Sequence, residues 1–411
     1  MGRNDRTRSV AGNAFQSGMV SAAPFIGTSL DAVLSAAVRE GVAPGVVAAA
    51  GNADEVIYVK ALGDRDVDAH APMALDTVFW IASLTKAVTT TAALQLVEQR
   101  RLSLDGDAGD IVSELREVPV LEGFDESGRP KLRPAVRPIT LRSLLTHTSG
   151  MTYFSWHAET ARYIDYAGLP HLFTCANRAL ATPLAHDPGA GWNYGIGLDW
   201  AGKMVETVSG QTLEEYFREA IFAPLGMPDT AFRIRPDMRT RLARVYERQS
   251  DGSMQAVDLE LPQDPEFLMG GGGLYSTVPD YLRFMRMILN DGELDGERVL
   301  SPATVTAMCT NQIGELEVRR LVSTEEGGND MELFPGTPKK WGYGFLINVD
   351  EAPTGRSAGS LGWAGTANCY YWIDRARGVA GVTMMQFVPF ADARAIDMAM
   401  AFETAVYRAL A

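Results

Sequence analysis

The sequence predicts an α/β protein in which one antiparallel sheet, flanked by the terminal helices, is joined to a mainly helical second lobe. Two observations predict the sheet: the chain opens with a helix and two β-rich runs, and it closes with two β-rich runs and a helix. Between them, helix-capping patterns alternate with long loops. Because a sheet must bury an apolar face, the economical arrangement places both terminal helices on one side of a shared sheet. We therefore expect an α/β lobe from residues 1–105 and 290–411, and a helical lobe from residues 106–289.

The opening stretch carries clear element signals. We expect residues 1–27 to form a loose arm and the first helix to begin near Thr28, because Thr28 and Asp31 are spaced as a capping box. Residues 46–50 and 56–62 are apolar runs separated by turn residues, which is the pattern of a β-hairpin.

The closing stretch mirrors this opening, whereas the middle does not. Residues 368–373 and 379–388 predict a second hairpin, and a last helix is expected over residues 392–410. In the middle, cap residues and first-turn prolines predict several helices. These helices are expected near Thr140, Asp199, Thr212, Pro279 and Pro302. Segments 228–268 and 311–340 carry little pattern, and loops of that length often serve as lids or pocket walls.

The composition limits the classes of partner. The 411 residues carry a net charge of −14, which argues against nucleic acid and anionic membrane as partners. No segment is long and apolar enough to span a bilayer. The three cysteines, Cys175, Cys309 and Cys369, are far apart and odd in number, so they indicate neither a disulfide framework nor a metal motif. We expect free thiols, a cytoplasmic protein, and neither a metal nor another cofactor.

A serine and a lysine three residues apart mark the candidate centre of chemistry. Ser83 and Lys86 lie in an apolar segment that runs to Val97, and positions i and i+3 share one face of a helix. A serine is a poor nucleophile until a base takes its proton, and a buried lysine can be that base because burial lowers its pKa. The other lysines have no serine three residues before them. The segment has no clearly polar face, which predicts a buried helix and favours a functional Lys86 over a surface residue.

Acyl transfer needs further groups besides a nucleophile and a base. A general acid must protonate the leaving alcohol, and two N–H donors must face the developing oxyanion. Tyr194, between a turn and a predicted helix, is the best candidate for the acid/base, and a half-buried packing tyrosine is the alternative. The backbone N–H groups of Ser83 and Thr366 are candidate donors, because glycines before Thr366 allow a substrate carbonyl to approach the backbone.

A competing serine is present in the sequence. Residues 355–359 match G-x-S-x-G around Ser357, a nucleophile elbow that has meaning only between a strand and a helix. No helix is expected soon after Ser357, and every histidine of the chain precedes it, so the required order of serine, acid and histidine fails. We therefore prefer Ser83 as the nucleophile.

Together these motifs resemble the serine β-lactamase and penicillin-binding-protein superfamily, and most of all its esterase branch, the family VIII carboxylesterases related to class C β-lactamases. The resemblance covers the chain from about residue 28 to its end. It is carried by Ser83-x-x-Lys86, by Trp192-x-Tyr194 with Leu198-Asp199, by Trp363-Ala364-Gly365, and by segments 144–150 and 270–276. It implies a β-lactamase-like fold with the active site in the cleft between the two lobes.

The resemblance implies a role for each matched residue. Ser83 is the acylated nucleophile, Lys86 assists its deprotonation, Tyr194 acts as general base and acid, and the N–H groups of Ser83 and Thr366 form the oxyanion hole. Aromatic and small residues beside the motifs are expected to line the substrate pocket, with the protein core as the alternative. These are Tyr153, Phe154, Trp156, Trp192, Trp363, Ala364 and Gly365.

Two departures from the lactamase pattern bear on the substrate. Ile196 stands where the lactamases carry asparagine in the second motif, and no Lys-Ser/Thr-Gly occurs anywhere in the chain. The cation that would hold a β-lactam or peptide carboxylate is therefore missing, which favours neutral short-chain or aromatic esters. Ala364 replaces the first glycine of the more common Trp-Gly-Gly and is expected to narrow the acyl pocket slightly.

Residues 118–125 and 146–150 also resemble the fungal acyltransferases that add a side chain to statin precursors. Hydrolysis and acyl transfer pass through the same acyl-enzyme and differ only in the acceptor that the pocket admits. We therefore expect a serine esterase acting on a small-molecule ester. An acyltransferase with an alcohol acceptor is the alternative, and a weak β-lactamase and an inactive binding relative are minor ones.

Overall fold

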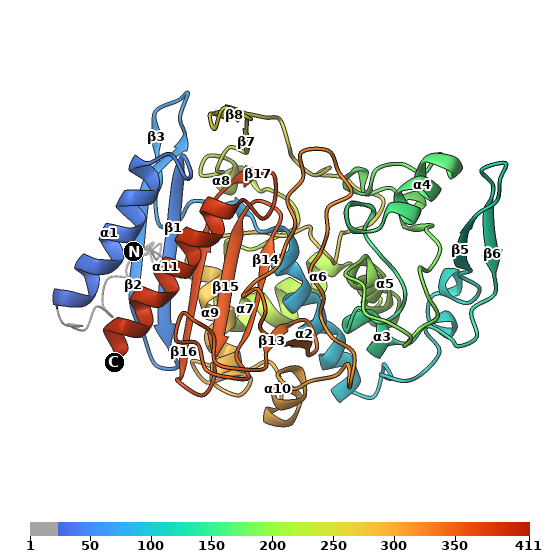
Figure 1. Cartoon of the computed structure of the whole chain (residues 1–411). Coiled ribbons are helices and arrows are strands. Elements are labelled where there is room, and N and C mark those ends of the chain that lie inside the picture. The colour runs from blue at the N-terminus through green and yellow to red at the C-terminus, as the bar shows by residue number, and fades with distance from the viewer. Residues whose placement is uncertain (1–23) are drawn as a thin grey trace, which may run out of the picture.

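The structure, a computed structural model, describes residues 24–411 and contains one large antiparallel sheet (Figure 1). Eight strands form it in the order β12-β13-β14-β15-β16-β1-β2-β3, and β1 of the opening hairpin pairs with β16 of the closing one. The strands are β1 (Gly45–Asn52), β2 (Val56–Asp66), β3 (Ala71–Pro72), β12 (Lys339–Trp341), β13 (Leu346–Asn348), β14 (Leu361–Gly365), β15 (Cys369–Asp374) and β16 (Val379–Met384). The predicted sheet built from both ends of the chain is confirmed.

Local side-chain contacts explain why both hairpins turn where they do. The Asn52 side chain accepts the N–H groups of Asp54 and Glu55 at 2.8 and 2.7 Å, which closes the turn between β1 and β2. At the other end, Asp374 accepts the N–H of Arg377 at 2.9 Å. Asparagine and aspartate favour turns because their short side chains bond to backbone groups two or three residues ahead.

The two terminal helices cover one face of the sheet (Figure 1). Helix α1 (Pro24–Arg39) and helix α11 (Ala393–Leu410) pack against each other, and the Phe402 ring of α11 contacts the rings of Tyr58 and Trp372 on the sheet. Helix α9 (Val278–Leu289) packs against β1 and β16. The predicted placement of the terminal helices on one side of the sheet is confirmed.

Two predicted boundaries need correction. Helix α1 begins at Pro24, so Thr28 lies inside the helix and does not cap it, in keeping with the preference of proline for a first helical turn. Most of the predicted arm, residues 1–23, lies outside the described residues. Helix α9 falls within the residues that we assigned to the helical lobe, yet it packs against the sheet, so residue 289 does not separate two packing units. The rest of the division into two lobes stays a prediction.

The middle of the chain is rich in short helices, as predicted, and also contains small sheets. Thr140 and Thr212 each form a complete capping box at the start of a helix. The helices are α2 (Thr85–Glu98), α3 (Leu141–Leu145), α4 (Ala158–Ala167), α5 (Gly197–Ser209), α6 (Leu213–Phe217), α7 (Ala223–Leu225), α8 (Pro236–Arg239) and α10 (Pro302–Met308). The remaining strands are β4 (Phe79–Trp80), β5 (Val120–Phe124), β6 (Pro130–Arg133), β7 (Tyr246–Arg248), β8 (Met254–Ala256), β9 (Tyr275–Ser276), β10 (Glu293–Leu294), β11 (Glu297–Arg298) and β17 (Phe387–Val388).

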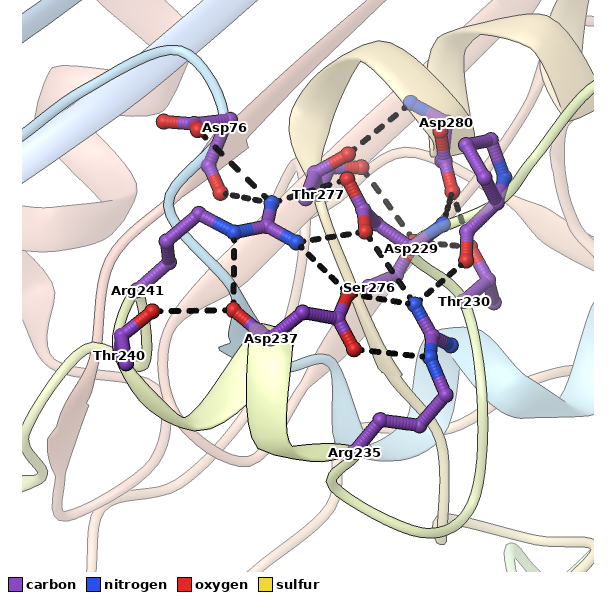
Figure 2. A network of polar contacts seen from close by, with 11 residues as sticks. Asp76, Asp229, Thr230, Arg235, Asp237, Thr240, Arg241, Ser276, Thr277 and Asp280 are labelled. Atoms are coloured by element: carbon purple, nitrogen blue, oxygen red, sulfur yellow. Dashed lines mark hydrogen bonds and ion pairs between the residues drawn. The ribbon is translucent and has the colours of Figure 1, made fainter. Parts of the chain in front are cut away.

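A network of arginines and carboxylates supports the strand pair β4–β9, which leads into the Ser83 segment (Figure 2). Arg241 contacts Asp229 at 2.7 Å. The Asp280 carboxylate accepts the N–H of Asp229 at 2.7 Å and the hydroxyl of Thr230 at 2.9 Å. The Thr230 hydroxyl in turn lies 2.7 Å from that of Ser276 in β9. These contacts tie residues 229–241 to β9 and to the start of α9.

Within residues 24–411, none of the helices has the length and apolar character needed to cross a membrane.

Candidate active site

Ser83 lies in a tight turn between β4 and α2. One 3₁₀ turn, Ala82–Leu84, joins the strand to the helix, and Ala82 adopts a left-handed conformation with φ of 44°. Such a conformation is costly for a residue with a Cβ and persists only where its surroundings enforce it. Here the Ile81 N–H donates to the carbonyl of Leu274 at 3.0 Å, and the Tyr281 hydroxyl donates to the carbonyl of Leu84 at 3.1 Å. The Ser83 segment is thus held on both sides.

Lys86 is buried beside Ser83 on the first turn of α2. Its side chain is 1% exposed, and its Nζ lies 3.0 Å from Ser83 Oγ, 3.0 Å from the Tyr153 hydroxyl and 2.5 Å from the Gly271 carbonyl oxygen. Burial lowers the pKa of the Lys86 ammonium from its ordinary value, because removal from water disfavours the charged form. The predicted pairing of the two side chains and the predicted burial of α2 are both confirmed.

Tyr194 precedes α5 and lies among other aromatic rings. Its hydroxyl accepts the indole N–H of Trp363 at 2.9 Å, and its ring centroid lies 4.7 Å from Lys86 Nζ and 4.8 Å from the His147 ring. Burial raises the pKa of Tyr194, and hydrogen bonds to Ser83 and Trp363 offset only part of this effect. The phenol therefore stays protonated at neutral pH, which suits a proton donor.

Strand β14 brings Gly365 and Thr366 against the turn that carries Ser83. A Cβ atom on Gly365 would lie 2.4 Å from the carbonyl oxygen of Ile81 and 3.1 Å from Leu84 Cδ1. Only glycine allows the strand to approach the turn this closely. Thr366 follows directly and lines the same cavity as Ser83, in keeping with the predicted oxyanion hole, although the direction of its N–H remains a prediction.

We expect Gly365→Ala to lower the rate of acylation at Ser83 by about 10²-fold, the usual cost of losing one oxyanion donor. The added methyl group collides with the Ile81 carbonyl, so β14 must move away from the turn and carry the Thr366 N–H with it. The measurement is the single-turnover rate with a p-nitrophenyl ester. Ala364→Gly is the matched control, because Ala364 is the neighbouring residue of the same strand and is 1% exposed. Equal rates for wild type and Gly365→Ala would remove Thr366 from the proposed oxyanion hole.

Ser83, Tyr153, Tyr194 and Thr366 open into one cavity of about 600 Å³. Its wall is mixed: aromatic and aliphatic side chains alternate with polar ones, and the glutamates Glu247, Glu325 and Glu326 also line it. Its apolar part suits the apolar portion of a substrate. Parts of both patternless segments, 228–268 and 311–340, contribute to it, as expected for pocket walls. The apolar lining residues are Trp80, Ala82, Phe154, Trp156, Leu172, Phe173, Leu259, Met269, Val388, Pro389 and Phe390.

Four residues predicted to contact substrate do not line this cavity. Trp192, Trp363, Ala364 and Gly365 are all buried, and none of them is among the lining residues of the described chain. The two tryptophans pack behind Tyr194 around the Trp341 ring, with centroids 5.6 and 4.7 Å from it. They support Tyr194 from behind, because aromatic rings pack preferentially with one another. Ala364 is therefore too deep to narrow the acyl pocket.

The structure adds two groups that sequence reasoning missed. Tyr153, predicted only as a pocket wall, brings its hydroxyl to Lys86. Asp199, to which the sequence analysis assigns no role of its own, is completely buried on α5 and accepts the N–H of Gly271 at 2.8 Å. The signal available in the sequence was an aspartate directly between the apolar residues Leu198 and Trp200. Ser357, the competing serine, lies outside the cavity, where its N–H donates to Asp374 at 2.9 Å.

Comparisons with known proteins agree with this geometry. The family model described as Beta-lactamase matches residues 30–405. The chain is 35% identical over 404 residues to a lovastatin esterase of Penicillium rubens, covering 92% of this chain and 98% of that protein. It is also 35% identical over 374 residues to the monacolin J acid methylbutanoyltransferase of Aspergillus terreus, covering 85% and 88%. The solved structure of simvastatin synthase from Aspergillus terreus, LovD9 mutant, superposes with a TM-score of 0.80 at 33% identity, covering 93% and 98%. The resemblances found in the sequence are thereby confirmed, and the chain belongs to the β-lactamase family.

Proposed function

We propose that this protein is a serine esterase that hydrolyses short-chain or aromatic carboxylic esters through an acyl-enzyme on Ser83. The observation that carries the proposal is the 3.0 Å contact between the buried Lys86 amine and Ser83 Oγ, which lies at the wall of the cavity. A nucleophile paired with a base whose pKa is lowered by burial is the arrangement that covalent catalysis requires. Its membership of a family with a lovastatin esterase supports this assignment.

In the proposed acylation step, the Lys86 amine takes the Ser83 proton as Ser83 Oγ bonds to the ester carbonyl carbon. The carbonyl oxygen becomes negative and is stabilised by the N–H groups of Ser83 and Thr366. The bond to the leaving alcohol then breaks, and the Tyr194 hydroxyl gives its proton to the departing oxygen. Transfer of the Lys86 proton to the Tyr194 oxygen restores both groups.

Deacylation is the reverse sequence with water in place of the alcohol. The Tyr194 proton moves to Lys86, and Tyr194 takes the proton of water as the water oxygen attacks the acyl carbon. When the bond to Ser83 breaks, Lys86 returns a proton to Ser83 Oγ. An alcohol that reaches the same position gives acyl transfer, and relatives named as acyltransferases favour this second candidate function.

The charge of the cavity wall disfavours anionic substrates, because Glu247, Glu325 and Glu326 line it. Arg248 is the only arginine or lysine among the lining residues of the described chain. Its Nε donates to Asp392 at 2.5 Å and one of its terminal nitrogens donates to the Val42 carbonyl at 2.6 Å, so its charge is already engaged. A substrate carboxylate would find no free cation, which disfavours β-lactams and peptides.

We further propose that the protein acts in the cytoplasm, since all three cysteines are free.

The two candidate functions predict different fates for one acyl group. With a p-nitrophenyl short-chain ester, an esterase releases acid and p-nitrophenol at equal rates in water. An acyltransferase releases p-nitrophenol quickly only when an alcohol is added, and the acyl group appears on that alcohol. Lovastatin is included as a second donor because of the named relative. Absence of both turnover and an acyl adduct in the intact-protein mass would overturn the proposal.

A further inference from the structure

Asp199 is a buried carboxylate, and only one of its two oxygens has a hydrogen-bond partner among the described residues. It lies on α5 and is completely buried, and its Oδ1 accepts the N–H of Gly271 at 2.8 Å. Its Oδ2 is buried and makes no hydrogen bond within the part of the chain that the structure describes. An unpaired carboxylate is expensive to bury, so its presence here needs a reason.

A single glycine connects this carboxylate to Lys86. Gly271 donates its N–H to Asp199 and accepts a hydrogen bond from Lys86 Nζ at 2.5 Å through its carbonyl oxygen. A Cβ atom on Gly271 would lie 2.7 Å from Asp199 Oδ2 and 3.0 Å from the Tyr153 hydroxyl. Because Gly271 has no side chain, the Asp199 carboxylate and the Tyr153 hydroxyl can both lie close to the backbone segment that contacts Lys86.

Each member of this pair stabilises the charged form of the other. Burial lowers the pKa of Lys86, and the Asp199 charge opposes that shift. Burial raises the pKa of Asp199, and the Lys86 charge opposes that shift in turn. Each charge is therefore less costly to bury when the other is present than when it is absent.

The other titratable groups around the pair stay in one form near neutral pH. Burial raises the pKa values of Tyr153, Tyr194 and Cys175, and the Asp199 charge raises them further. Burial, with the Lys86 charge, lowers the pKa of His147 well below its ordinary value. Elsewhere on the cavity wall, burial raises the pKa of Glu325 and lowers that of His171, and Glu247 and Glu326 also line the wall. Within the buried cluster behind Ser83, Lys86 and Asp199 are the pair whose protonation states depend on each other.

We propose that Asp199 is the positioning residue of this site: through Gly271 it holds the Lys86 amine against Ser83, and its carboxylate is the counter-charge for Lys86 whenever the lysine carries the serine proton. The inference rests on the proposed function, because it concerns the base that activates Ser83. An alternative is that Asp199 only anchors the Gly271 loop by its hydrogen bond. The two roles differ in whether the negative charge of Asp199 is needed, since only the first requires a carboxylate.

Asp199→Asn separates these alternatives. The asparagine keeps an oxygen that accepts the Gly271 N–H but loses the negative charge. The readout is the rate at which a fluorophosphonate phosphonylates Ser83, followed by intact-protein mass across pH. Because the reaction needs the neutral amine, the rate falls at acidic pH as Lys86 becomes protonated. This fall is the acidic limb of the pH–rate profile. Without the Asp199 charge Lys86 gives up its proton more easily, so we expect this acidic limb to move to lower pH by about one unit.

Asp280→Asn is the matched control. Asp280 is also buried, also accepts a backbone N–H and also has a pKa that burial raises, to about 7, but its partners are those of the network in Figure 2. Its variant is expected to leave the acidic limb in place. An unmoved limb in Asp199→Asn would overturn the inference. Absence of Ser83 phosphonylation in the wild type would instead overturn the proposed function.

A second measurement does not depend on catalysis or on the single Asp199 variant. In Lys86→Met the buried carboxyl loses its counter-charge, so its pKa rises further above the unfolded value. A raised pKa of an acid adds stability below the unfolded pKa that is lost as pH rises through the folded pKa. The free energy of unfolding of Lys86→Met should therefore fall between acidic and neutral pH. Equal slopes for Lys86→Met and the double variant Lys86→Met/Asp199→Asn would overturn the inference.

Discussion

Replacement of Ser83 by alanine is expected to abolish ester turnover, with a loss of at least about 10⁴-fold, as found when the nucleophile of a serine hydrolase is removed. The covalent intermediate cannot form without Oγ. Among the described residues that line the cavity, Tyr153 is the only other one whose hydroxyl lies within hydrogen-bond distance of the Lys86 amine. The measurement is the initial rate of p-nitrophenol release, combined with the intact mass of the protein after mixing. The wild type should gain the mass of one acyl group, and the variant should gain none.

The chain offers its own control for this experiment. Ser357 belongs to the G-x-S-x-G match, but it lies outside the cavity and bonds to Asp374 through its backbone. Ser357→Ala should therefore turn over ester at the wild-type rate. If Ser83→Ala retained activity and Ser357→Ala lost it, the nucleophile would have been assigned to the wrong serine.

Replacement of Lys86 by methionine is expected to slow acylation by about 10³-fold, within the range that a positioned general base contributes. Methionine fills similar space without a charge, so the change removes the base but keeps the packing of the buried helix α2. The measurement is the pre-steady-state burst with a p-nitrophenyl ester, which isolates acylation from deacylation. Thermal unfolding of both proteins verifies that the variant is folded.

Lys203→Met provides the matched control, because Lys203 is only partly buried and lies 5.9 Å from the Phe267 ring, away from the cavity wall. Its activity should stay within about twofold of the wild type, as expected for a partly exposed residue that does not line the cavity. A full burst in Lys86→Met would show that another group takes the Ser83 proton, and Tyr153 would then be the next residue to change.

The overall plan of the fold could be predicted from the sequence because its signals are local. Asn52, Thr140 and Thr212 each bond to a backbone group within three residues, so the turn or cap is encoded where it is formed. The pairing of Ser83 with Lys86 is equally local, since one helical turn sets it. The predicted start of α1 near Thr28 is four residues too late, because the Thr28 and Asp31 pattern resembles a cap although it lies inside the helix.

The depth at which a side chain lies could not be predicted in this way. Trp192 and Trp363 stand beside the motifs in the sequence, yet they pack behind Tyr194 because Trp341, from a distant strand, occupies the space between them. The packing of helix α9 against the sheet could not be predicted for a related reason. An amphipathic pattern indicates that a helix buries one face, but it does not identify the surface against which that face packs.

What the sequence determined by itself is the class of chemistry: a serine, a lysine and a tyrosine at the right spacings, in a fold built from both ends of the chain. What only the tertiary structure decided is the charge balance around them. Asp199 and Lys86 are more than 100 residues apart in the sequence and meet through one glycine of a third segment. Burial that removes all three from water makes their charges interdependent, and burial is a property of the assembled core that no single stretch of sequence contains.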